Sequence, residues 1–225
     1  MDRELTASQS NSMDSLNLRV DGFLDGFLHR LRSDDEEAAV QDEVAELRAA
    51  WPGRAINLAS IAPERLPACD HLDFALERGT SDREANLAVS IAALAPALRW
   101  TYSYPTNPRD RDLSSKVAFA QIVGGRGLQA DSEIHVGLTL IAPHVVYPAH
   151  RHPAVELYLV ISGTALWQSG EVEPAMQPPG SVILHPSNVV HAMTTFEEPL
   201  LAVWTWRGDL GSPSVYANAR ATATV

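Results

Sequence analysis

His150-Arg-His152-Pro-Ala-Val-Glu156-Leu-Tyr158-Leu-Val-Ile-Ser-Gly163 is the stretch that decides the fold of this chain. It places two histidines and a glutamate at the spacing of metal ligands and ends in a glycine turn. A second segment downstream, residues 180–191 (GSVILHPSNVVH), adds His191. Three imidazoles and one carboxylate suit a divalent first-row metal such as zinc, iron(II), manganese or nickel. The pattern therefore predicts a metal site, and an octahedral ion in it would keep open positions for a substrate.

Short alternating runs of apolar and polar residues follow Ser115. They are typical of a β-sandwich or barrel, and we expect strands over 116–123, 133–142, the motif stretch, 164–168, 181–185, 189–195 and 200–207. Side chains two residues apart leave a strand on the same side, so Glu156 and Tyr158 should share one face. If His150 and His152 continue the edge of that strand, they share this face as well. In a small barrel it is the interior.

The first hundred residues carry a different pattern. Apolar residues over 16–31 recur at helical spacing, a second helix should cover 33–51, and a third should start at Ser81 and be kinked or shortened by Pro96. We expect residues 1–14, which are polar, to be frayed. The helices should form a cap on the β domain or a dimerisation element.

The turn-rich segment 101–115 marks the predicted boundary between the two parts. Residues 1–100 then form a helical N-terminal region, and residues 101–225 form a mainly β barrel that carries the metal site. The tail beyond Gly208 is small and polar, so we expect it to be loose.

The amino-acid composition restricts the classes of partner that this chain could bind. The 225 residues carry a formal net charge of −11, which disfavours nucleic acids and anionic membranes. No run approaches the roughly 18 apolar residues of a membrane span, and the N-terminus lacks the features of a secretory signal. Cys69 is the only cysteine, so no intrachain disulfide can form, which fits a reducing cytoplasm. We expect a cytoplasmic protein with a small-molecule partner.

The motif stretch resembles the first cupin motif, G-x5-H-x-H-x3,4-E-x6-G. The two histidines, Glu156 and Gly163 are in register, and His144 stands where the motif has its leading glycine. The resemblance implies a cupin fold, a double-stranded β-helix or jelly-roll barrel. It also implies four metal ligands: His150, His152, Glu156 and His191.

Residues 180–195 resemble the second cupin motif, G-x5-P-x-G-x2-H-x3-N. Its first glycine, proline and histidine are present, but Asn188 replaces the inner glycine and Thr195 the asparagine. Asparagine tolerates a positive φ angle, so the barrel is still expected. His144 and His185 lie beside the motifs, and we expect them to be supporting or surface residues rather than ligands.

Within the cupins, the stretch VYPAHRHPAVELYLVISGTALW (146–167) is similar to the dimethylsulfoniopropionate (DMSP) lyases. The helical extension and the length make it look like the DddL type more than the shorter DddQ type, over most of residues 100–216. The family's proposed base is the tyrosine that follows the glutamate ligand, which corresponds to Tyr158. Tyr147, three residues before His150, is a second candidate catalytic residue.

The resemblance implies a β-elimination that releases dimethyl sulfide and acrylate. A metal that holds the substrate carboxylate would stabilise the charge that develops next to it, and a base must reach the neighbouring carbon. The sulfonium is a cation without hydrogen-bond donors, so aromatic faces suit it at roughly 0.5–2 kcal/mol each. The candidate substrate-binding residues are Tyr147, Tyr102, Tyr104, Trp204 and Trp206.

Other functions remain open at this point. The same ligands would serve an iron-dependent cupin dioxygenase, a non-catalytic small-molecule-binding cupin, or a lyase for another β-substituted acid. We expect a homodimer, because cupins commonly pair their barrels and the helices have apolar residues to spare.

Overall fold

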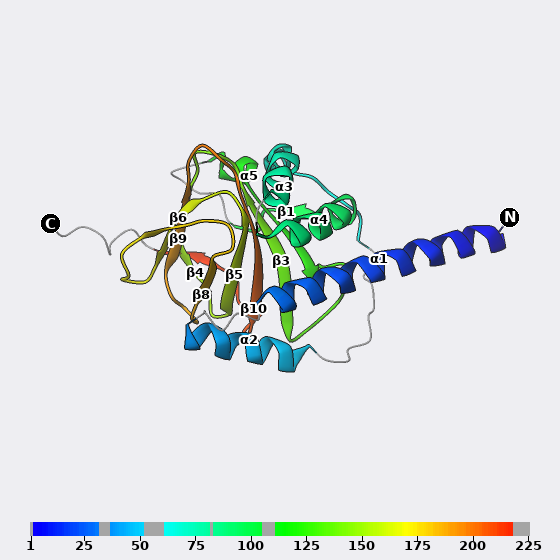
Figure 1. Ribbon diagram of the computed structural model, residues 1–225, viewed down its shortest axis with the longest axis horizontal. Helices are drawn as coiled ribbons and strands as arrows, with labels where there is room; N and C mark the ends of the chain where they lie inside the picture. Colours follow the sequence, from blue (N-terminus) through cyan, green and yellow to red (C-terminus); the bar gives the residue numbers. More distant parts are fainter. Residues whose placement is uncertain (1, 32–36, 52–60, 82, 105–110, 218–225) are drawn as a thin grey trace.

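The computed structural model describes residues 2–31, 37–51, 61–81, 83–104 and 111–217, and their side chains from residue 14 on. These residues form a barrel of two β-sheets with helices packed outside one of the sheets (Figure 1). This architecture confirms the predicted fold class, a mainly β jelly-roll barrel with helices in its N-terminal part.

Both sheets are antiparallel, with strand orders β1-β2-β3-β10-β5-β8 and β11-β4-β9-β6-β7. The first contains β1 (Trp100–Thr101), β2 (Val117–Val123), β3 (Ile134–Ile141), β10 (Leu200–Arg207), β5 (Val155–Ser162) and β8 (Val182–His185). The second contains β11 (Val215–Tyr216), β4 (Val146–Arg151), β9 (His191–Thr195), β6 (Ala165–Ser169) and β7 (Ala175–Gln177). The strands β1, β7 and β11 are two or three residues long, and their short sequences give no alternating pattern from which to predict them.

Alternation along the strands separates two cores. On β5, Leu157, Leu159 and Ile161 pack against the helices, whereas Tyr158 and Val160 belong to the cluster inside the barrel. Side chains alternate because successive residues of a strand point to opposite faces. The six-stranded sheet therefore needs an apolar cover outside the barrel, and the N-terminal helices supply it.

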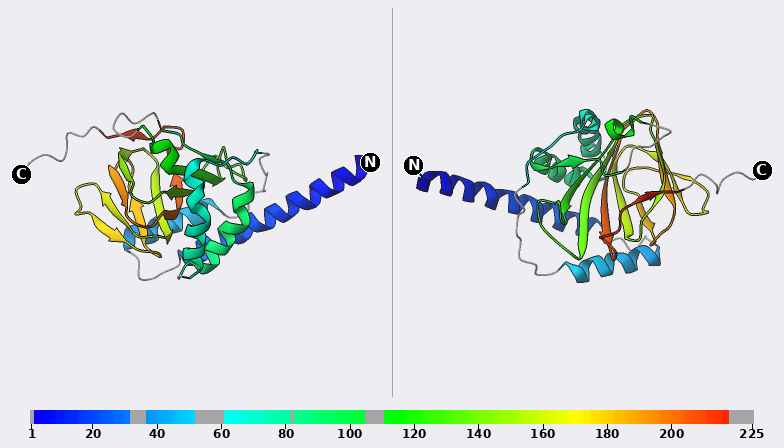
Figure 2. Two further views of the ribbon diagram at one scale, coloured as in Figure 1. Left: turned by 90° about the horizontal axis from the view of Figure 1, so that it is seen from above. Right: turned by 180° about the vertical axis from the view of Figure 1, so that it is seen from behind.

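In the part of the chain that the structure describes, four α-helices precede the barrel: α1 (Asp2–Arg30), α2 (Ala38–Ala50), α3 (Leu72–Thr80) and α4 (Ala85–Leu94). The short helix α5 (Leu113–Lys116) is a single turn beside β2. The buried residues of α1 follow the predicted helical spacing. Contrary to the expected frayed start, α1 begins at Asp2, and its first turns project from the barrel (Figures 1 and 2). No proline or glycine interrupts the helix before Gly22. None of the helices in the described ranges combines the length and apolar character that a bilayer crossing requires.

Two shorter features complete the helical part. The 3-10 helix Ala95–Ala97 contains Pro96, and α4 ends just before it at Leu94, as the proline predicts. A second 3-10 helix, Pro67–His71, leads into α3. The predicted start of the second helix at residues 33–36 lies outside the described residues, so its first described turn is that of α2.

Two partly buried ion pairs fix the helices to the barrel. The Arg30 guanidinium donates to Glu84 Oε1 at 2.6 Å and to the Gly180 carbonyl oxygen at 2.7 Å, which joins α1, α4 and the turn before β8. Arg207 of β10 donates two hydrogen bonds to the Glu43 carboxylate of α2, at 3.0 and 2.7 Å. Glu84 and Glu43 are both buried. Removing either arginine would leave a buried charge, at a cost of about 3–5 kcal/mol.

The motif stretch is two strands rather than one. His150 lies on β4 of the five-stranded sheet, and Glu156 lies on β5 of the six-stranded sheet. His152 sits in the connection between them. The condition under which His150 and His152 would share the face of Glu156, that they extend its strand, is therefore not met. The histidines reach the glutamate because the two sheets face each other across the barrel interior.

His144 and Asn188 stand at two positions where the cupin motifs have a glycine. Both residues adopt positive φ angles, 58° at His144 and 63° at Asn188. The backbone N–H of Asn188 donates to the His152 carbonyl oxygen at 2.9 Å. Thr195, in the place of the motif asparagine, donates its hydroxyl to the Ala142 carbonyl oxygen at 2.6 Å and accepts the Val145 N–H at 3.0 Å. The replacements therefore keep the turns that the motif residues would make.

Residues 208–217 are ordered, contrary to the expected loose tail, and the rest of that predicted tail lies outside the described residues. Tyr216 of β11 pairs with His150 of β4, and the Ala217 N–H donates to the Ala149 carbonyl oxygen at 2.8 Å. The Asp209 carboxylate accepts the backbone N–H groups of Gly211 and Ser212. Backbone pairing and a local turn hold this segment, and neither leaves a hydrophobic pattern in the sequence.

Gly163, the last residue of the motif, should not tolerate a side chain. Its φ is 78°, and a Cβ there would collide with the Pro199 carbonyl oxygen. We expect Gly163→Ala to lower the free energy of unfolding by about 2 kcal/mol or more, in a denaturant titration. Gly125→Ala is the matched control, because no atom lies within 4 Å of its Cβ position. Equal losses in the two variants would contradict this account of the turn.

Candidate metal centre

A cavity of about 730 Å³ opens inside one end of the barrel. Strands β2, β3, β4, β5 and β10 form its walls, and residues 210–214 of the C-terminal segment also line it. Its aromatic lining consists of Tyr104, Phe119, Tyr147, Tyr158, Trp204 and Trp206. His150, His152 and Glu156 line the same cavity. The walls thus combine apolar rings with one polar group of potential metal ligands.

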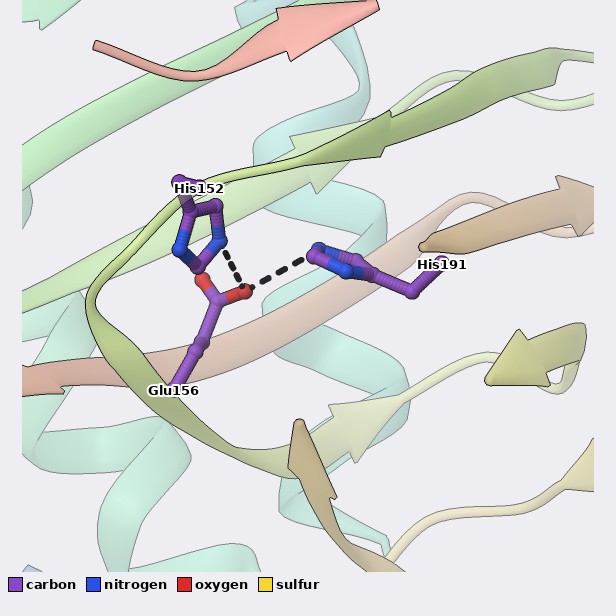
Figure 3. Close-up of side chains that lie close together, drawn as sticks. All are labelled: His152, Glu156 and His191. Carbon is purple, nitrogen blue, oxygen red and sulfur yellow. Dashed lines mark hydrogen bonds and ion pairs between the residues drawn. The ribbon is translucent and has the colours of Figure 1, made fainter. Parts of the chain in front are cut away.

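Three of the four predicted ligands converge. One ligand atom from each of His152, Glu156 and His191 lies within 4.8 Å of the other two. Glu156 Oε2 is 3.0 Å from His152 Nε2 and 3.3 Å from His191 Nε2 (Figure 3). All three side chains are buried. They come from the β4–β5 connection, from β5 and from β9, so both sheets contribute to the group.

The backbone sets the tautomer of each histidine. Nδ1 of His152 lies 3.0 Å from the Ala154 carbonyl oxygen, and Nδ1 of His191 lies 3.0 Å from that of Val189. Nδ1 of His150 lies 2.8 Å from the Pro148 carbonyl oxygen. A carbonyl oxygen only accepts, so each Nδ1 carries the proton and donates. Each Nε2 then presents a lone pair, which is how backbone partners orient metal-binding histidines.

These residues fit a bound metal ion. Two Nε2 lone pairs and a carboxylate oxygen face one another in the barrel interior, and such acceptors repel unless a cation lies among them. His191 Nε2 has no hydrogen-bond partner among the described residues. Either an extra proton or a metal ion must satisfy the group, and nitrogen and oxygen donors of this kind suit divalent transition metals.

Glu156 is held ionised. Burial by itself would raise the pKa of the Glu156 carboxyl, but positive charge and donated hydrogen bonds on the side of His152 and His191 outweigh burial and hold the pKa well below its usual range. The other carboxylate oxygen, Oε1, accepts the indole N–H of Trp206 at 2.7 Å. Trp206 also packs on His152, with ring centroids 4.3 Å apart. One oxygen is thereby anchored, and the other is turned to the histidines.

His150 borders the group without joining it. Its ring centroid lies 4.1 Å from that of His191 and 6.3 Å from that of His152. Burial, followed by the neighbouring His191, lowers the pKa of His150 well below its usual range, so the imidazole is neutral. A neutral imidazole whose Nδ1 donates to the backbone can coordinate a metal through Nε2. The structure thus places His150 beside the ligand group, as a candidate fourth member.

The two candidate catalytic tyrosines share the cavity with this group. Tyr158 follows Glu156 by two residues on β5, and both side chains face inward. Burial raises the pKa of the Tyr158 phenol well above its usual range, and the charge of Glu156 acts in the same direction. Burial raises the pKa of Tyr147 likewise. Tyr147 packs on His150, with ring centroids 4.5 Å apart.

Four of the five predicted substrate-binding aromatics line the cavity: Tyr104, Tyr147, Trp204 and Trp206. Trp204 has room because Gly137 lies opposite it on β3, where a Cβ would overlap the indole ring. Tyr102 instead lines a smaller cavity, and its hydroxyl lies 2.8 Å from that of Tyr216. It contacts two of the rings that line the main cavity, Tyr104 at a centroid distance of 6.0 Å and Phe119 at 6.4 Å.

Several cavity residues were missed in the sequence. Phe119 and Gln121 follow the alternation of β2, so the strand pattern could have indicated them. His135 lies on β3 beside Gln121, and its Nδ1 is 3.5 Å from Gln121 Nε2. Residues 210–214 carried no signal, because the chain returns to the barrel through the backbone pairing of β11 and through contacts of Tyr216 with residues distant in the sequence.

A jelly-roll barrel with a buried His-His-Glu group between its sheets defines a cupin. The chain belongs to the dimethylsulfoniopropionate lyase family, whose model matches residues 47–202. This confirms the resemblance drawn from the two motifs.

Two relatives are similar in sequence. The putative dimethylsulfoniopropionate lyase DddL of Cereibacter sphaeroides is 32% identical over 149 residues, which cover 65% of this chain and 62% of that protein. Dimethylsulfoniopropionate lyase DddQ of Ruegeria pomeroyi is 28% identical over 155 residues, 69% of this chain and 77% of that protein. The chain thus matches less than two thirds of the length of DddL.

Solved structures agree on the fold. One from a study of the DMSP lyases RdDddP and RnDddQII has a TM-score of 0.75 and 27% identity, and the match covers 90% of this chain and all (100%) of that one. DddQ of Ruegeria pomeroyi DSS-3 has a TM-score of 0.65 at 24% identity, over 81% of this chain and 98% of that one. The similarity includes most of the helical part as well as the barrel.

We expect Trp206 to be needed for metal affinity, because its indole N–H orients Glu156. Trp206→Phe should weaken Zn²⁺ binding about 10- to 100-fold in a competition titration against a chelator. Trp204→Phe is the matched control, because the Trp204 N–H has no hydrogen-bond partner among the described residues. If both variants bound Zn²⁺ equally well, the indole–carboxylate bond would not matter for the site.

Proposed function

We propose that this protein is a metal-dependent lyase that cleaves dimethylsulfoniopropionate to dimethyl sulfide and acrylate. One observation carries the proposal. The phenol of Tyr158 and the carboxylate of Glu156 lie two residues apart on β5 and face one aromatic cavity, and Glu156 belongs to the buried ligand group. The family to which the chain belongs, and the named activities of DddL and DddQ, support the same substrate.

In this proposal His152, Glu156 and His191 hold the metal, with His150 as the fourth ligand. The bound ion would act as a Lewis acid that holds the substrate carboxylate and stabilises the negative charge developing beside it. We leave the choice among zinc, iron(II), manganese and nickel to measurement, since the donor set suits each of them.

Tyr158 acts as the base. Its phenolate takes the proton from the carbon next to the carboxylate, and the C–H electron pair becomes the double bond of acrylate. The C–S bond breaks, and dimethyl sulfide leaves with that bond's electron pair. The proton then passes from Tyr158 to water. Burial raises the pKa of Tyr158, so a cation among the neighbouring ligands is what would favour the phenolate.

The aromatic walls would bind the sulfonium. Trp204 and Trp206 pack against each other with ring centroids 5.6 Å apart, and Tyr104 contacts Tyr147 edge to face at 5.7 Å. Ring faces attract cations that have no hydrogen-bond donors, and a dry wall strengthens that attraction. The walls also keep water away from the reacting carbon. Tyr102 has no direct part in this arrangement.

The first test mixes purified protein with DMSP and follows dimethyl sulfide in the headspace, acrylate in solution and dissolved oxygen. We expect both products in equal amounts, no oxygen consumption, and loss of activity after chelation that added metal restores. Oxygen consumption with turnover would indicate a dioxygenase. Thermal stabilisation by DMSP without product would indicate a binding protein. The homodimer and the cytoplasmic location proposed from the sequence need separate measurements.

The role of Tyr158 can be tested separately. Tyr158→Phe removes the base and should lower kcat at least about 100-fold, while metal content measured by elemental analysis stays at the wild-type level. Tyr147→Phe removes a second buried phenol from the same cavity and should have a smaller effect. Unchanged turnover in Tyr158→Phe would exclude this residue as the base.

A further inference from the structure

His185 is a buried histidine that the proposed mechanism does not use. It is the last residue of β8 and is fully buried, at 0% exposure. Its ring lies parallel to that of His191, with centroids 4.1 Å apart and planes 12° apart. Trp167 packs on His185 as well, at 6.1 Å and 21°. One metal ligand is thus an outer member of a stack of three rings inside the barrel.

Ser169 determines how His185 is oriented. The Ser169 hydroxyl lies 3.1 Å from Nδ1 of His185. Ser169 itself pairs with His191 between β6 and β9, and His185 pairs with Glu156 between β8 and β5. The Ser169–His185 pair therefore connects the backbone positions of two candidate ligands that belong to different sheets.

The contact between the rings of His185 and His191 also joins the two ends of the turn between β8 and β9. His185 and His191 are the residues at the two ends of this turn, residues 186–190. The N–H of Asn188 within it donates to the carbonyl oxygen of His152, and the carbonyl oxygen of Val189 accepts Nδ1 of His191. The contact between the two rings thus fixes a turn that touches two of the three converging ligands.

An imidazole at this place is not the most stable choice. Nε2 of His185 is buried and has no hydrogen-bond partner among the described residues, and an unpaired buried nitrogen costs free energy compared with an apolar ring of the same shape. A phenyl ring would stack on His191 without that cost. A phenyl ring could not form a hydrogen bond with Ser169. That hydrogen bond keeps the imidazole of His185 in one orientation.

We propose that His185, held by Ser169, is a positioning residue that keeps the His191 imidazole oriented for metal binding. The inference rests on the metal site of the proposed function. It assigns the pair a role in metal affinity and none in contact with substrate, because the described cavity walls are formed by other residues.

The test measures Co²⁺ affinity and, in the metal-free protein, thermal stability. His185→Phe should weaken Co²⁺ binding about 10- to 100-fold, as the loss of partners that orient ligands typically does, while the Tm of the metal-free protein stays equal or rises. Ser169→Ala should weaken binding in the same direction. His29→Gln, on the exposed face of α1, is the control and should change neither quantity. A residue that only fills space would not lose metal affinity without also lowering the Tm.

Each other outcome decides against the inference. If wild-type protein binds Co²⁺ and both variants bind within twofold of it, His185 does not position the site, although the proposed function stands. If saturated His185→Phe shows a Co²⁺ absorption spectrum with one nitrogen ligand fewer, His185 is itself a ligand. If wild-type protein binds no metal, the proposed function fails together with the inference. Ser169→Ala gives the answer should His185→Phe fail to fold.

Discussion

Three lone-pair acceptors meet in the interior of this barrel, and their mutual repulsion is the constraint on which the rest of the site depends. Nε2 of His152 and of His191 face one carboxylate oxygen of Glu156 within a buried group. Backbone carbonyls hold the imidazole protons on the far nitrogens, so the near nitrogens cannot act as donors without an added charge. A bound cation would relieve this repulsion. Both sheets are needed to bring the acceptors together.

The charge in this group of acceptors also affects how readily each of the two tyrosines ionises. Burial raises the pKa values of Tyr158 and Tyr147 alike, so neither phenol ionises readily in its apolar surroundings. Tyr158 has the carboxylate of Glu156 two residues away on its own strand. Negative charge there opposes ionisation, and positive charge at the same place favours it. Whatever occupies the ligand group therefore acts most directly on Tyr158.

Helices and C-terminal segment hold the barrel in a shape that keeps the site enclosed. The arginine–glutamate pairs at Arg30 and Arg207 connect the helices to the turn before β8 and to β10. Residues 210–214 line the cavity, and β11, which follows them, pairs with β4 at His150. The stack of Trp167, His185 and His191 brings side chains of β6, β8 and β9 against the ligand group. Parts of the chain that look unrelated in sequence thus support one small group of polar atoms.

Local pattern was enough to predict much of this molecule. Alternation and turn residues predicted the main strands, helical spacing predicted the buried face of α1, and the ligand types at motif spacing predicted the metal group. Each of these signals arises between residues close together in the chain, where strand and helix geometry fix which side chains share a face. The resemblance to the DMSP lyases rested on the same short segments.

Tertiary structure alone decided the rest. The sequence could not show that His150 and Glu156 belong to different sheets, because a break of three residues between β4 and β5 leaves no mark on a pattern of alternation. Nor could it place the C-terminal segment over the cavity, or His185 against His191. Those arrangements come from pairing between distant strands and from packing across the barrel, and such contacts depend on where the chain returns rather than on the residues beside each position.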